Sequence, residues 1–182
     1  MTDTDSTPGA DPLATIELTV ETPEAMAEFG AHVGRQLRAG DIVALDGELG
    51  AGKTTFTRGL GEALGVRGAV TSPTFVLART HPRASGEPPL VHVDAYRLGS
   101  PAELDDLDID VAASIVVIEW AAGMIDGLSD SVLNIRIERP TGGDGTYTSE
   151  DVAANLTEPI EPRSVTVIPT GDRWRQHPFR DR

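Results

Sequence analysis

Residues 47–55 have the types and the spacing needed to bind phosphate groups. They read Gly-Glu-Leu-Gly-Ala-Gly-Lys-Thr-Thr, which contains the pattern G-x-x-x-x-G-K-[ST] of a phosphate-binding loop. Glycines allow unusual backbone angles and a close approach to a ligand, so successive N–H groups can surround anionic oxygens. Lys53 can then reach the β- and γ-phosphates, and the Thr54 hydroxyl can ligate Mg²⁺. The predicted nucleotide-binding residues here are Gly47, Glu48, Leu49, Gly50, Ala51, Gly52, Lys53, Thr54 and Thr55.

The residues around this loop support that interpretation. Residues 41–46 form a short apolar run typical of a buried strand. After the loop, Phe56, Leu60 and Leu64 recur at helical spacing, and Gly65 stands where a helix would end. Lys53 is the only lysine in the chain. A strand, a loop and a helix in this order are the context that a phosphate-binding loop requires, whereas a Gly-rich turn with a chance lysine is the alternative.

Two acidic residues follow apolar runs further along the chain. Glu119 closes the run 115–118, and Asp94 closes the run 91–93. Mg²⁺ prefers a few protein oxygens together with substrate phosphates and waters. Glu119 and Asp94 are therefore catalytic candidates: either could hold Mg²⁺, and the other could orient an attacking water. The alternative is that each carboxylate only caps a strand by binding loop N–H groups.

Other side chains have weaker claims to chemistry. Ser72 and Thr74 flank Pro73, and their hydroxyls could reach a γ-phosphate or simply stabilise a turn. Arg97 could stabilise transition-state charge, although a surface ion pair is the commoner role of an arginine. We interpret His92 as a core histidine rather than a ligand. Trp120 is interpreted as a packing residue or partner contact.

The composition excludes several classes of protein. The chain has 182 residues, no cysteine and a net charge of −14. Disulfides and thiolate metal sites are therefore absent, a cytoplasmic location is expected, and broad direct binding to nucleic acid is disfavoured. No apolar run approaches the roughly 20 residues of a membrane span. Residues 1–13 lack the apolar core of a signal peptide and predict a disordered leader.

The remaining pattern predicts one α/β domain over residues 14–182. Strands are expected at 14–20, 75–79, 90–93, 115–118, 132–138 and 165–168, with the last two paired. One helix is expected to start at Thr22-Pro23 and stop at Gly40, and a short one to open at 101–104 after Ser100. Residues 140–162 read as a mobile insertion, and the basic tail 173–180 as a solvated or loosely docked terminus. The fold class is a three-layer mixed sheet like that of P-loop NTPases, with helices on both faces and its ligand at the carboxyl ends of the strands.

The motif set as a whole resembles one family. Residues 47–55, the run Ser-Pro-Thr-Phe at 72–75, the pattern H-x-D-x-Y-R-L at 92–98 and Ile-Glu-Trp at 118–120 are similar to the bacterial tRNA threonylcarbamoyladenosine biosynthesis ATPases, TsaE. The resemblance implies a weak, partner-stimulated ATPase that acts with TsaD and TsaB and meets tRNA only through them. It implies that TsaD carries the transferase site. It also implies that Thr54 and Glu119 bind Mg²⁺, that Asp94 lies near the catalytic water, and that the turn at Thr22 approaches adenine.

Two other functions remain open at this stage. A small-molecule kinase on the same scaffold would need an arginine-bearing lid, for which Arg79 and Arg83 are candidates. A non-catalytic, nucleotide-gated binding module would use the same loop without turnover. The guanine-reading sequence Asn-Lys-x-Asp is absent because there is no second lysine, so ATP is the expected nucleotide in each case.

Overall fold

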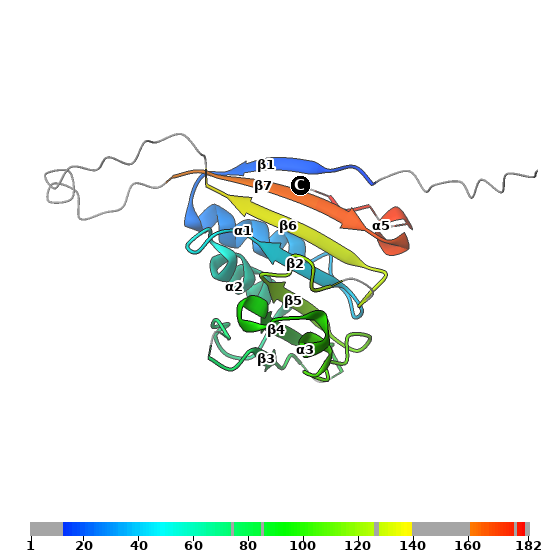
Figure 1. Cartoon of the computed structure of the whole chain (residues 1–182). Coiled ribbons are helices and arrows are strands. Elements are labelled where there is room, and N and C mark those ends of the chain that lie inside the picture. Colours follow the sequence, from blue (N-terminus) through cyan, green and yellow to red (C-terminus); the bar gives the residue numbers. More distant parts are fainter. Residues whose placement is uncertain are drawn as a thin grey trace, which may run out of the picture.

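The computed structural model describes residues 13–73, 75–84, 86–125, 128–139, 161–176 and 178–180. Within these ranges, seven strands form one sheet in the order β1-β7-β6-β2-β5-β4-β3 (Figure 1). β2 is parallel to β5 and β6, and β4 is parallel to β5, whereas β1–β7, β6–β7 and β3–β4 are antiparallel. The mixed sheet and the predicted pairing of the last two strands are thereby confirmed. The strands are β1 (Ile16–Val20), β2 (Ile42–Asp46), β3 (Ala78–His81), β4 (Leu90–Asp94), β5 (Ile115–Glu119), β6 (Val132–Glu138) and β7 (Arg163–Thr170).

The helices begin and end where the local chemistry predicts, with two differences. The Thr22 hydroxyl accepts a hydrogen bond of 3.1 Å from the Ala25 N–H and so caps α1. α1 ends six residues before the glycine expected to stop it, although Leu37 still packs against the core. Ser100 precedes α3 but makes no side-chain cap bond. The helices are α1 (Pro23–Gly34), α2 (Lys53–Leu64), α3 (Pro101–Asp105) and α5 (Asp172–Gln176), with a 3₁₀ turn, η1 (Ala95–Arg97).

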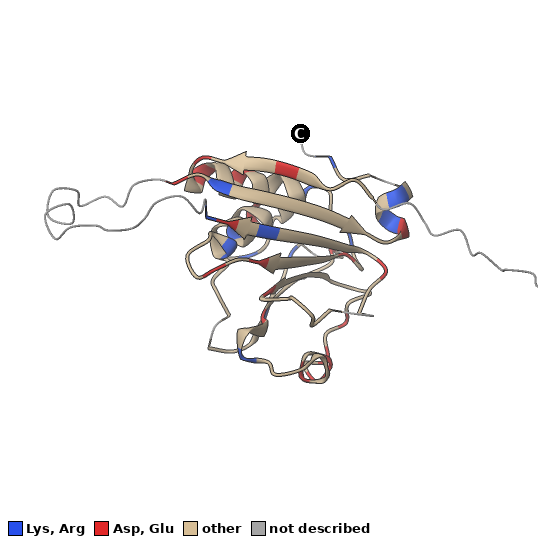
Figure 2. Ribbon diagram, turned by 45° about the horizontal axis from the view of Figure 1, so that its top comes forward, with Lys and Arg blue, Asp and Glu red and all other residues tan. Residues whose placement is uncertain are grey.

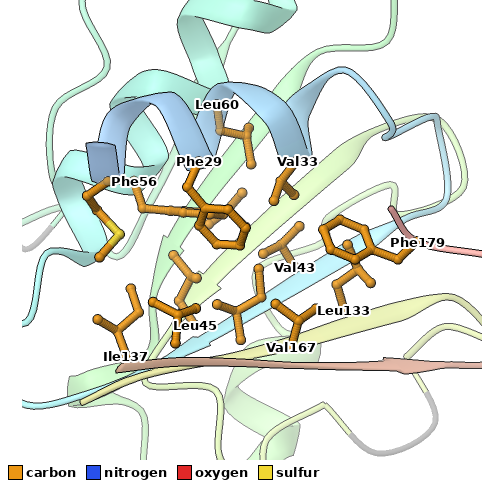
Figure 3. Packing of buried hydrophobic residues seen from close by; sticks show 14 of the residues in the cluster. Phe29, Val33, Val43, Leu45, Phe56, Leu60, Leu133, Ile137, Val167 and Phe179 are labelled. Atoms are coloured by element: carbon orange, nitrogen blue, oxygen red, sulfur yellow. The ribbon is translucent and has the colours of Figure 1, made fainter. Parts of the chain in front are cut away.

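Apolar side chains pack on both faces of the sheet. On one face, Phe29 and Val33 of α1 and Phe56 and Leu60 of α2 point at the central strands (Figure 3). On the other face, α3 and the segments around it cover the alternate residues of β2, β4 and β5, with Leu104 buried among them. Each central strand is buried on both of its sides, so the sheet and the segments packed on its two faces form the predicted three layers.

The strand expected at residues 75–79 begins three residues later. Pro73 accepts backbone hydrogen bonds from Val76 and Leu77, and Leu77 has a φ of 65°. Such a turn cannot join a sheet ladder, so pairing with β4 starts only at Ala78. The apolar character of Phe75 and Val76 therefore does not reflect burial: Phe75 is 92% exposed.

The basic tail was wrongly predicted to be solvated or loosely docked. Trp174 is 1% exposed and Phe179 is 7% exposed, and both belong to the main core cluster. Phe179 lies beside the other core side chains near α1 (Figure 3). Gln36 donates from its side chain to the Arg180 carbonyl at 2.9 Å and accepts from the Arg180 N–H at 3.0 Å. Burial of such aromatic side chains contributes roughly 1.5–3 kcal/mol each. The arginines of α5, which are blue in Figure 2, thus belong to a segment that its aromatic residues anchor.

Three sequence-based expectations lie outside the described residues. They are the leader up to residue 12, nearly all of the insertion expected at 140–162, and the side chain of Thr74. In the part of the chain that the structure does describe, no helix combines the length and the apolar character needed to cross a membrane.

Candidate functional site

The carboxyl ends of the parallel strands meet at one edge of the sheet, where a cleft of about 500 Å³ opens. The strand register sets Asp94 at the end of β4 directly opposite Glu119 at the end of β5. β2 ends beside them at Asp46 and leads into the phosphate-loop residues. The lining of the cleft comprises Leu49, Gly50, Gly52, Lys53, Thr54, Thr55, Ser72, Asp94, Tyr96, Glu119 and Trp120.

Glycine is required in the loop for two distinct reasons. Gly50 and Gly52 have φ angles of 78° and 115°, in the left-handed region that other residues disfavour. A Cβ on Gly47 would lie 2.4 Å from the Ile137 carbonyl oxygen, so a larger residue would displace the loop from β6. α2 then begins at Lys53 with no side-chain cap and no acidic residue in its first turn. Its N-terminal amides and the positive end of its dipole face the cleft, which suits an anion.

Lys53 is held at the centre of the site. Its ammonium donates hydrogen bonds of 2.7 Å to the Gly47 carbonyl and 3.1 Å to the Glu48 carbonyl. Burial lowers the pKa of this ammonium from its ordinary value of 10.5. Three neighbouring carboxylates oppose part of that shift, those of Glu119, Asp94 and Asp46. The loop and the strand ends therefore surround one buried cation.

The two candidate catalytic carboxylates have different partners. The Asp94 Oδ1 atom accepts a hydrogen bond of 3.0 Å from the Tyr96 N–H, as the strand-capping alternative predicts. Glu119 Oε1 lies 2.9 Å from Nε2 of the buried His92. Each side chain thus has one oxygen in a hydrogen bond and belongs to the cleft wall. Both residues are at most 5% exposed, so their charges act in a medium of low polarity.

Sequence reasoning underestimated the aromatic residues of the site. The Lys53 ammonium lies 3.9 Å from the centroid of the Trp120 ring, and the Tyr96 ring is 5.1 Å from that of Trp120. Trp120 has a φ of 60°, which a bulky residue adopts only where its surroundings enforce it. The only sequence signal that Trp120 contacts the site is its position directly after Glu119. Asp46 was also missed, although it closes the strand that precedes the loop.

Some predicted residues lie outside the cleft wall. Thr22 caps α1, whose Met26 packs near Gly52, so the turn adjoins the loop without lining the cleft. Arg97 is exposed on η1 and does not line the cleft. Three further loop residues support the loop without lining the cleft. The carbonyls of Gly47 and Glu48 accept hydrogen bonds from Lys53, and the Ala51 side chain is buried. Ser72 does line the cleft.

A second buried histidine predicts how stability depends on pH. His81 is 4% exposed, and burial lowers the pKa of its imidazole from 6.5, with His92 and Arg79 lowering it further. Between pH 6.5 and the lowered value, the unfolded chain takes up a proton that the folded chain does not, so stability falls as pH decreases through this window. The melting temperature should decrease from about pH 7.5 to 5.5, and His81→Leu should decrease less. Parallel curves for the two proteins would contradict this assignment.

The residues present fit a magnesium–nucleotide. The loop supplies left-handed glycines and helix amides for phosphate, Lys53 supplies a cation, and Thr54 and Glu119 supply oxygen ligands of the kind Mg²⁺ prefers. A mixed, doubly covered sheet with this loop at its carboxyl edge defines the class of P-loop nucleotide-binding proteins.

Comparisons with known proteins narrow the class. The family described as threonylcarbamoyl adenosine biosynthesis protein TsaE matches residues 20–145. The chain is 53% identical to the tRNA threonylcarbamoyladenosine biosynthesis protein TsaE of Streptomyces coelicolor over 152 residues, covering 82% of this chain and 93% of that protein. It is 39% identical to the protein of the same name from Bacillus subtilis over 65% of this chain and 73% of that protein. The crystal structure of Bacillus subtilis YdiB superimposes with a TM-score of 0.65 at 28% identity, covering 92% of this chain and 93% of that one. The chain belongs to the TsaE family.

Proposed function

We propose that this protein is a cytoplasmic, magnesium-dependent ATPase in the biosynthesis of tRNA threonylcarbamoyladenosine. It works with TsaD and TsaB, meets tRNA through them, and is not itself the threonylcarbamoyl transferase. The relatives at 39–53% identity carry the name of this pathway. The observation that carries the ATPase proposal is the convergence of Lys53, Asp94 and Glu119 on one cleft at the phosphate loop.

The phosphate-binding residues and the two carboxylates of the cleft have distinct parts in the proposed hydrolysis. The loop amides and Lys53 bind the phosphates and offset their charge. Thr54 and Glu119 would hold Mg²⁺, which would supply charge stabilisation to the phosphate oxygens. Asp94 orients the water that attacks the γ-phosphorus. ADP and inorganic phosphate are the products.

The rim of the cleft supports dependence on a protein partner. Leu49 is 88% exposed and Tyr96 is 70% exposed, and both line the cleft. Phe75 and Val76, which follow the Ser72 wall, are 92% and 52% exposed. Large apolar side chains gathered around a polar site are typical of a surface that a partner covers.

The kinase alternative gains no support from its candidate lid. The Arg79 guanidinium donates to the Thr71 hydroxyl at 2.7 Å. Arg83 donates to the Pro88 carbonyl at 3.1 Å and pairs with Glu87 at 3.3 Å. Neither arginine lines the cleft: Arg79 is bound to the segment before β3, and Arg83 to the β3–β4 loop.

The test measures phosphate release from ATP by the purified chain, alone and with the TsaB–TsaD pair. We expect slow hydrolysis alone and faster hydrolysis with the pair, and none above background for Lys53→Ala. Nucleotide binding without turnover in either condition would favour the nucleotide-gated module. Transfer of phosphate to a metabolite without partners, detected by mass spectrometry, would favour the kinase.

A further inference from the structure

His92 donates a hydrogen bond to Glu119. The imidazole is 0% exposed, and its Nε2 atom lies 2.9 Å from Glu119 Oε1. A carboxylate in such a contact accepts only, so Nε2 carries a proton. The other ring nitrogen, Nδ1, is buried and has no hydrogen-bond partner among the described residues. Within the part of the chain that the structure describes, the one hydrogen bond of this side chain is therefore with a residue of the cleft.

The sheet register produces this contact. His92 pairs with Val117 across β4–β5, and Asp94 pairs with Glu119. Because side chains alternate along a strand, His92 and Asp94 point to the same face as Glu119. His92 is the diagonal neighbour of Glu119, within reach of a long side chain. The spacing H-x-D thus sets one donor and one carboxylate beside the same glutamate.

Without the His92 donor, the Glu119 carboxylate would be attracted by the Lys53 ammonium instead. Lys53 is close enough for its charge to interact with that of Glu119. A buried carboxylate that lost its hydrogen-bond donor would turn toward the ammonium, because opposite charges attract strongly at low polarity. Such a pair would remove an oxygen from the metal site and a cation from the phosphates. A bond to Oε1 alone prevents this rotation and keeps the second oxygen available.

A purely structural role explains His92 poorly. An apolar side chain of similar size, on the same sheet face as Leu90 and Val117, would leave no ring nitrogen unsatisfied. A buried polar group with one atom that lacks a hydrogen-bond partner is typical of a functional site, where some stability of the fold is given up to keep the geometry that function requires.

We propose that His92 is a positioning residue that orients Glu119 for magnesium and that leaves nucleotide binding itself unaffected. This inference rests on the proposed magnesium–nucleotide site. Residues that orient a metal ligand in this way typically change metal affinity or activity by roughly 10- to 100-fold.

The test uses calorimetry of ADP binding with and without Mg²⁺ for the wild type, His92→Leu and His92→Gln. Leucine fills the space without a donor, and glutamine keeps an N–H. We expect all three to bind ADP equally without Mg²⁺, within about twofold. The magnesium-dependent gain in affinity should fall roughly tenfold or more in His92→Leu and be retained in His92→Gln. In a Glu119→Gln background, His92→Leu should cause no further loss of that gain.

Each contrary outcome is decisive. A wild-type magnesium gain in His92→Leu overturns the inference, as does an equal loss in His92→Gln or an additive loss in the double variant. An ADP affinity of the wild type that is the same with and without Mg²⁺ also overturns the inference. Wild-type protein that couples Mg²⁺ to nucleotide binding yet never hydrolyses ATP with TsaB and TsaD would refute the ATPase proposal alone, and the calorimetry would still decide the role of His92.

Discussion

Without Mg²⁺, Glu119→Gln is expected to bind ATP with nearly unchanged affinity, whereas it should lose the magnesium-dependent gain in affinity and slow ATP hydrolysis by roughly a hundredfold or more. Glutamine has the shape of glutamate and still presents a carbonyl oxygen to His92, so the cleft should keep its geometry. Only the negative charge is lost, and a neutral amide is a poor ligand for Mg²⁺. The phosphate loop and Lys53 remain to bind the nucleotide.

The measurement is phosphate release in the presence of TsaB and TsaD, with calorimetry for affinity. Glu138→Gln is the matched control, because Glu138 also ends a strand parallel to β2, namely β6, but is exposed and does not line the cleft. That variant should hydrolyse ATP like the wild type. Normal hydrolysis by Glu119→Gln would show that the metal is held elsewhere.

Local patterns predicted most of the elements that position the site. The phosphate loop, the apolar strands ending at Asp94 and Glu119, and the cap at Thr22 each depend on residues close together in the sequence. Such features follow from backbone conformation and the alternation or periodicity of apolar residues. The carboxyl edge then follows from the rule that parallel strands end together.

The features that sequence reasoning missed depend on contacts between distant residues. Phe75 and Val76 look like strand residues, but they lie in a turn whose hydrogen bonds the Pro73 carbonyl accepts, and this turn leaves them exposed. The tail looked solvated because its arginines outnumber its aromatic residues, whereas Trp174 and Phe179 fill space beside α1 that only the folded structure reveals. His92 is buried, as a core histidine would be, yet its bond to Glu119 depends on which strands are neighbours. Pairing of that kind is set by tertiary structure.

The phosphate loop also depends on an unusually close contact between α1 and α2. A Cβ on Gly59 of α2 would lie 1.9 Å from the Ala27 carbonyl oxygen of α1, and a Cβ on Gly30 of α1 would lie 2.0 Å from the Phe56 carbonyl oxygen. Each helix therefore uses a glycine to approach the backbone of the other. Because α2 begins at Lys53, a shift between the helices also moves the loop.

Gly59→Ala should therefore destabilise the protein by about 3 kcal/mol, because a backbone carbonyl cannot rotate away as a side chain can. In an exposed helix the same substitution would stabilise by up to about 1 kcal/mol, so even the sign of the effect tests the packing. Thermal unfolding should show a decrease of roughly 6–12 °C in melting temperature. Glu62→Ala, at an exposed position of the same helix, should change it little. An unchanged or higher melting temperature for Gly59→Ala would mean that the two helices are farther apart than described. We also expect the folded variant to bind ATP more weakly, because separating α2 from α1 draws the loop amides and Lys53 away from Asp94 and Glu119.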